Sequence, residues 1–86
     1  MRAKTGSSRM TLNKTRILTK RFGEYVRTSR ISSGKSQEEL GAYIGLSRVS
    51  VSARETGKEE WTLKQALDSL EFLEEDPMEV FSVIFA

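Results

Sequence analysis

Apolar residues recur at spacings of three and four along most of the chain, which is the period of an α-helix with one buried face. The repeat begins at about Thr15, and its first members are Leu18, Phe22, Tyr25 and Val26. No segment alternates apolar and polar residues in the way that predicts a β-strand. The pattern therefore predicts an all-α protein whose first helix starts near Thr15.

A pair of short helices is predicted in the middle of the chain. Ser36 and Glu39 form an S-x-x-E capping box, in which each side chain bonds to the other's free backbone N–H, and this box opens a helix over residues 37–44. Gly45 ends that helix, because glycine takes up the left-handed conformation without a clash. A serine cap then opens a third helix over residues 48–56. The sequence thus predicts two capped helices joined by a tight turn.

Two more helices complete the expected set of five. Thr62 caps a fourth helix, and Asp76 followed by Pro77 begins a fifth. Gly41 is unusual because it lies in the middle of the second helix, where glycine costs about 1 kcal/mol relative to alanine. We expect another helix to cross close to it. The five short helices predict an all-helical bundle.

The composition excludes several kinds of chemistry. The chain has 86 residues, enough for one small domain, and contains neither cysteine nor histidine. Zinc fingers, haem ligation, thiol nucleophiles and Ser–His triads each need one of these residues. We therefore expect no enzyme activity, no cofactor and no metal site. No apolar run approaches the roughly 18 residues that span a bilayer, and the N-terminus lacks the apolar centre of a secretory signal, so a cytoplasmic protein is expected.

Charge is distributed unevenly along the chain. Residues 1–21 carry basic side chains and no acidic one, whereas residues 59–86 are rich in Asp and Glu and contain one base, Lys64. Such asymmetry indicates a polyanionic partner for the basic half, although an ordinary solvated tail would have the same composition. Residues 1–13 also lack apolar periodicity. We expect a flexible basic arm there, followed by one domain over residues 14–86.

The third helix has an unusually small outward face. If Val51 points into the core, a step of 100° per residue places only short side chains outside and on the flanks. They are Val49, Ser50, Ser52, Ala53 and Thr56. Either this face packs against another helix, or the helix enters the major groove of DNA, which is just wide enough for one. The second interpretation is favoured because a helix-turn-helix uses its second helix in this way.

The segment resembles the phage repressor/Cro-type helix-turn-helix family, also called the XRE family. The resemblance rests on "GKSQEEL", "IGLSRVSVS" and "ETGK" at the correct mutual spacing, and it extends from about Phe22 to Phe81. It implies a five-helix lambda-repressor-like domain that binds operator double-stranded DNA as a dimer. Within the family, a phage Cro-like repressor or a restriction–modification controller fits a chain of this length.

The resemblance also implies roles for individual residues. Gln37 is expected to brace against a phosphate and the reading helix, and Arg30 and Glu55 to form an ion pair between the first and third helices. Reading positions and positions that contact the DNA backbone complete the expected DNA-binding set. The reading positions are Arg48, Val49, Ser52 and Ala53, and the backbone positions are Ser47, Ser50 and Lys58.

Four residues depart from the family pattern. Arg54 stands where a large apolar residue usually seats the reading helix, and we expect it to reach a phosphate or an acid of the fourth helix. Ser29 replaces a core apolar residue, which predicts a slightly underfilled core. Glu74 takes the place of a glycine that commonly ends the fourth helix, so that turn is expected to differ. Trp61 replaces a proline and is expected to pack over the fourth helix.

The C-terminal sequence "VFSVIFA" is more apolar than one small core requires. A large exposed apolar patch usually marks an interface, and a two-fold dimer is the commonest arrangement. We expect Val80, Val83, Ile84 and Phe85 to form a homodimer interface, unless this tail folds back over its own core. A dimer would hold two reading helices about 34 Å apart and predicts an inverted-repeat operator.

The sequence therefore predicts a homodimeric, sequence-specific transcriptional regulator of the bacterial cytoplasm and nucleoid, expected to be a repressor, with no small-molecule ligand. The basic arm would lie along phosphates or in the minor groove, or it is a disordered leader. The alternative from another class is a protein-interaction module, such as an antitoxin whose apolar C-terminal helix binds a partner protein.

Overall fold

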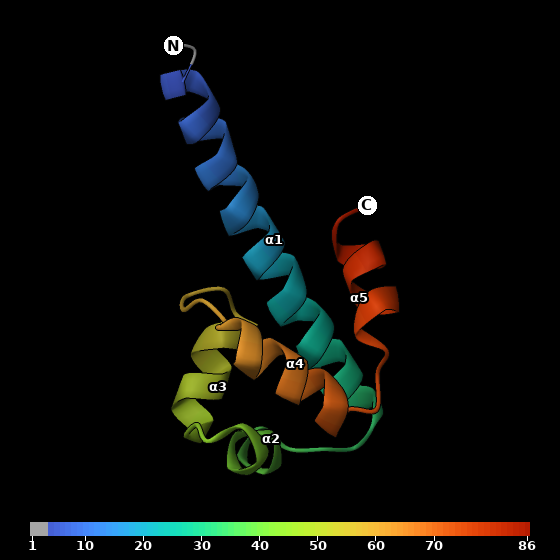
Figure 1. The fold of residues 1–86 in the computed structure, drawn as a ribbon. Helices are drawn as coiled ribbons and strands as arrows, with labels where there is room; N and C mark the ends of the chain where they lie inside the picture. The colour runs from blue at the N-terminus through green and yellow to red at the C-terminus, as the bar shows by residue number, and fades with distance from the viewer. Residues whose placement is uncertain (1–3) are drawn as a thin grey trace.

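The computed structural model describes residues 4–86 of the chain, with side chains from residue 14 onward. Five helices follow one another: α1 (Lys4–Ser32), α2 (Gln37–Ile44), α3 (Arg48–Glu55), α4 (Leu63–Phe72) and α5 (Pro77–Ile84) (Figure 1). The described residues contain no strand. The expected all-α, five-helix architecture is confirmed.

Helix α1 is the main difference from the sequence prediction. It begins at Lys4, not near Thr15, and its N-terminal part extends beyond the other four helices (Figure 1). Residues 4–14 contain no proline, and a helix that has already formed propagates with little further cost per residue, so weak apolar periodicity does not end it. The flexibility of the basic arm stays a prediction, and its first three residues lie outside the described part of the chain.

The capping signals of the sequence are present in the structure. The Ser36 hydroxyl accepts a hydrogen bond from the Glu39 amide at 3.0 Å, and the Glu39 carboxylate accepts one from the Ser36 amide at 2.7 Å. Gly45 ends α2 with a φ of 79°. Thr62 forms a second capping box at the start of α4, and Asp76 caps α5 with proline directly after it. These local patterns fix where α2 to α5 begin.

Gly41 allows the turn between α2 and α3 to fold back onto α2. A Cβ at this position would lie 2.3 Å from the Leu46 carbonyl oxygen and 3.4 Å from Val51 Cγ2. The Leu46 amide also donates to the Gly41 carbonyl at 2.8 Å. The nearest neighbour is therefore the turn itself, and α3 also comes close to Gly41 through Val51, as the expected approach of another helix requires.

The core is shared by all five helices. Its buried apolar members are Phe22, Val26, Leu40, Val51, Ala66, Leu70, Leu73, Val80 and Ile84. Among the described residues, no helix is both long and apolar enough to cross a membrane.

The turn between α4 and α5 is held by polar contacts to α1. The Glu75 carboxylate accepts hydrogen bonds from the Tyr25 hydroxyl at 2.9 Å and from the Ser29 hydroxyl at 2.7 Å. Ser29 thus makes a specific contact where an underfilled core was expected. Glu74 adopts a φ of 59°, the left-handed conformation that glycine takes without strain. The turn keeps the glycine-type backbone although the residue is not glycine.

Candidate nucleic-acid interface

A buried ion pair sets the position of α3. Arg30 Nε lies 2.8 Å from Glu55 Oε2, and a second guanidinium nitrogen donates to Glu55 Oε1 at 3.1 Å. Arg30 is 8% exposed and Glu55 is 1% exposed. Two parallel hydrogen bonds between a guanidinium and a carboxylate fix direction as well as distance. The expected tie between the first and third helices is confirmed.

The N-terminus of α2 joins the same network. Gln37 Nε2 donates to Glu55 Oε1 at 3.0 Å, and Arg30 Nη1 donates to the Lys35 carbonyl at 2.7 Å. Glu55 therefore accepts three hydrogen bonds, as a buried carboxylate must if its desolvation is to be offset. Gln37 contacts α3 through Glu55, while its contact with a phosphate stays a prediction.

The outward face of α3 is short and open to solvent. Arg48 is exposed, the Val49 side chain is 69% exposed, and Ser52 and Ala53 are half-buried. Only Val51 and Glu55 of this helix are buried. The alternative in which the small face packs into the core therefore fails for Val49. This face can approach another surface closely because its side chains are short, apart from Arg48 at the start of the helix.

The residues expected to contact the DNA backbone lie at the two ends of α3. Ser47 caps the helix, with its hydroxyl accepting from the Ser50 amide at 3.1 Å. The two hydroxyl oxygens of this pair are also 3.1 Å apart. At the other end Lys58 is exposed, and its amide donates to the Ala53 carbonyl at 2.8 Å. The expected DNA-binding residues thus lie on or beside α3, apart from Gln37 at the start of α2.

Arg54 connects α3 to α4 through Gln65, where an acid of α4 was one of the two expected partners, and a contact with a phosphate, the other, stays a prediction. Its Nε donates to Gln65 Oε1 at 3.2 Å, and its Nη1 donates to the Ser50 carbonyl at 3.1 Å. Gln65 Oε1 also accepts from the Thr62 amide at 3.0 Å as part of the α4 capping box. Sequence reasoning missed Gln65, although the T-x-x-Q pattern that starts with Thr62 is a recognisable capping signal.

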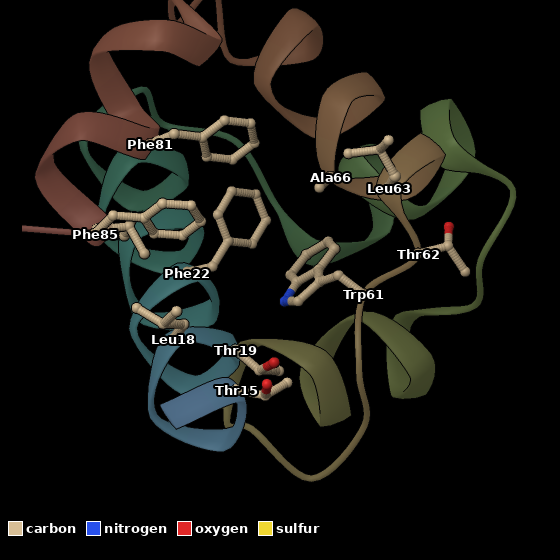
Figure 2. A pocket seen from close by; sticks show the side chains of 11 residues that line it. Thr15, Leu18, Thr19, Phe22, Trp61, Thr62, Leu63, Ala66, Phe81 and Phe85 are labelled. Atoms are coloured by element: carbon tan, nitrogen blue, oxygen red, sulfur yellow. The ribbon is translucent and has the colours of Figure 1, made fainter. Parts of the chain in front are cut away.

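An apolar pocket of about 510 Å³ lies between α1, the start of α4 and the end of α5. Figure 2 shows the rings of Phe22, Trp61 and Phe81 at its wall, with Leu18 and Phe85 nearby. The Phe22 and Trp61 rings meet edge to face with centroids 5.1 Å apart. Trp61 packs against the core through Phe22 of α1, where packing over the fourth helix was expected, and its buried indole N–H has no hydrogen-bond partner among the described residues.

The expected dimer interface divides into two groups. Val80 and Ile84 are only 1% and 4% exposed because they pack in the core of their own chain. The alternative in which the tail folds back describes the burial of these two residues, and their part in a homodimer interface stays a prediction. Val83 and Phe85 are 64% and 65% exposed and are available to a partner.

Among the described residues, no group of three or more acidic side chains is placed to hold a metal ion. A comparison with curated proteins found no match to this chain. A family model, HTH_3 (Helix-turn-helix), matches residues 26–78, which is more than half of the chain and includes α2, α3 and α4 in full. The chain therefore belongs to the XRE-type helix-turn-helix family of DNA-binding transcription regulators.

Proposed function

We propose that the protein is a repressor that binds an inverted-repeat operator as a homodimer and reads the major groove with α3. The observation that carries this proposal is that α3 exposes short side chains, Val49 above all, while its buried Val51 faces the core and its buried Glu55 is held by hydrogen bonds. A groove-reading helix needs short side chains toward the bases and a fixed orientation, because base-edge hydrogen bonds depend on both. The Arg30–Glu55–Gln37 network supplies such an orientation.

Each outward residue has a matching partner on DNA. Arg48, exposed at the first turn of α3, fits a bidentate contact with guanine O6 and N7. Val49 and Ala53 fit contacts with thymine methyl groups, and Ser52 fits a base edge. The remaining residues of the set have backbone amides or side-chain donors suited to phosphates. These are Gln37, Ser47, Ser50 and Lys58.

The homodimer rests on α5. Val83 on α5 and Phe85 directly after it are exposed, and exposed apolar side chains of this size favour association. A two-fold dimer would place two copies of α3 in successive major grooves. Bound in this way over a promoter, it would exclude other proteins from the same DNA, which is the simplest route to repression.

Selection from a random duplex pool tests the proposal. We expect enriched inverted repeats with half-sites one helical turn apart. Arg48→Ala should then lose about 1–3 kcal/mol of affinity for the selected site, the value of one bidentate base contact, with little change on random DNA. Lys64→Ala, on α4, serves as the matched control for loss of an exposed charge.

Two results would contradict parts of this proposal. Equal loss on selected and random DNA would show that Arg48 does not read a base. A monomer in sedimentation equilibrium at tens of micromolar would contradict the homodimer. It would also favour the second candidate, in which Val83 and Phe85 bind a different protein, as in an antitoxin.

A further inference from the structure

A second polar site lies just beyond the C-terminal end of α3, and half of its lining residues precede the part of the chain matched by the family. It is a hollow of about 250 Å³ between α1 and the loop that joins α3 to α4. Its lining residues are Thr15, Arg16, Thr19, Gly57, Lys58 and Glu60. In Figure 1 this loop runs beside the middle of α1.

Close packing holds α1 against this loop. A Cβ on Gly57 would lie 3.3 Å from Lys20 Cγ and 3.5 Å from Lys20 Cβ, so the stem of Lys20 rests on Gly57. Gly57 has a φ of 83°, and the amide of Lys58 bonds back to Ala53 in α3. The side chains of α1 at this level are therefore held in a fixed relation to the last turn of α3.

The charges at this site are unbalanced. Arg16 and Lys20 are one helical turn apart on α1, so they share a face, and Lys58 faces them from the loop. All three are exposed, and none forms an ion pair within 4.0 Å among residues 14–86. Glu60 is the single carboxylate among the lining residues that the structure describes. The hydroxyls of Thr15 and Thr19 add hydrogen-bond donors, which together with the cations match the chemistry of a phosphate.

We propose that this hollow binds a backbone phosphate of DNA next to the base pairs that α3 contacts. This inference rests on the proposed placement of α3 in the major groove. Gly57 and Lys58, which line the hollow, follow closely after the end of α3, so a phosphate in the hollow would lie beside the DNA that α3 contacts. The α1 residues involved lie outside residues 26–78. The longer α1 of this chain thus adds a phosphate contact to those that the matched helix-turn-helix can make.

A phosphate contact has a distinctive thermodynamic signature. Each one releases counterions, so it steepens the dependence of log K on log salt by roughly 0.9 and is worth about eight-fold in affinity at 0.1 M salt. It carries no base information, so it strengthens binding to selected and random sequences equally. These properties separate this site from the reading residues of α3.

The test compares two double variants with the same change of net charge. Arg16→Gln with Lys20→Gln removes the α1 cation that lines the hollow and the one beside it, and Arg27→Gln with Lys64→Gln removes two exposed cations elsewhere. For the first we expect a salt slope shallower by about 0.9 and an affinity at 0.1 M salt lower by about eight-fold, the values for one lost phosphate contact, on both selected and random duplexes. The control variant should leave the salt slope almost unchanged and should change the affinity at 0.1 M salt by no more than about two-fold. Equal effects of the two variants, or none, would overturn the proposal.

A third variant is expected to change the DNA affinity in the opposite direction, which loss of the fold would not do. Glu60→Gln removes this carboxylate from the hollow and should bind both duplexes more tightly, because a repulsive charge beside the phosphate is gone. Weaker or unchanged binding would count against the site. If no sequence is enriched by selection, the random duplex still measures this contact, so the groove-reading proposal and this one fail separately.

A final arm separates DNA from free phosphate as the source of the ligand. Inorganic phosphate, exchanged for chloride at constant ionic strength, should not displace DNA. Displacement that disappears in the Arg16→Gln, Lys20→Gln variant would assign the hollow to free phosphate and overturn its assignment to DNA.

Discussion

Helices α3 and α5 have the same length and bury the same two positions, yet they are held in opposite ways. Each has eight residues and two buried side chains four positions apart, Val51 and Glu55 in α3 and Val80 and Ile84 in α5. In α3 one of the two is a carboxylate held by Arg30 and Gln37, whereas in α5 both are hydrocarbon. A bidentate ion pair fixes rotation about the helix axis, while apolar burial depends mainly on the area removed from water.

The exposed faces differ in the same sense. The outward face of α3 presents a cation and small side chains, while that of α5 presents Val83 and Phe85. A helix that reads base edges must be oriented accurately, and a helix that offers an apolar surface to another protein can tolerate small shifts. The two kinds of anchor therefore match the two kinds of surface that we propose.

The largest expected effect tests the polar anchor of α3. Arg30→Ala leaves Glu55 buried without its cation and should lower the free energy of unfolding by about 3–5 kcal/mol, measured by urea denaturation. The exposed ion pair of Lys64 and Asp68, 2.7 Å long, is the control, and Lys64→Ala should cost at most about 1 kcal/mol. Similar losses for the two variants would remove the distinction between the helices.

Two valines of α5 test its apolar anchor. Val80→Ala creates a cavity in the core and should destabilise the protein by about 2 kcal/mol. Val83→Ala removes the same atoms from an exposed position and should leave unfolding almost unchanged, while it weakens self-association in sedimentation experiments. Loss of stability with Val83→Ala at protein concentrations too low for association would show that this residue belongs to the core.

A smaller effect is expected in the turn that leads into α5. Glu74→Gly relieves the left-handed conformation of a residue with a Cβ, which costs roughly 1–2 kcal/mol, and glycine returns part of that gain by freeing the unfolded chain. We expect a net stabilisation of about 0.5–1 kcal/mol by thermal denaturation. Destabilisation would mean that Glu74 makes a contribution that its backbone conformation does not explain.

The smallest effect concerns the polar contact of the same turn with α1. Burial, followed by the hydrogen bond to Glu75 and its negative charge, raises the pKa of Tyr25 above its ordinary value. The neutral phenol is thus favoured in the folded state. The contribution of Tyr25 to the free energy of unfolding is fully present below about pH 10, its pKa in the unfolded chain. It is lost as the pH rises through the higher pKa of the folded state. Tyr25→Phe should remove this loss from the alkaline stability profile. An unchanged profile would show that other groups cause it.

Much of the fold follows from local patterns. The starts of α2 to α5 were predicted because a cap involves residues within three or four positions of one another, as in Ser36 and Glu39. The ion pair of Arg30 and Glu55 was inferred from a family resemblance, and the structure confirms it. The predicted start of α1 was wrong because apolar periodicity indicates a buried face, and a helix can continue through residues that lack this pattern.

The sequence by itself determined which segments are helical after Thr15, where their caps lie and that α3 has a small face, because these depend on neighbours along the chain. Only the tertiary structure decided which residues of each helix are exposed and which polar partners meet. Val80 and Val83 are both valines of α5, yet the first is buried and the second is exposed. Ser29 forms a hydrogen bond with Glu75, which lies 46 positions further along the chain. The physical reason is that burial and hydrogen bonding between helices depend on how whole elements pack, and that packing is set by all the helices together.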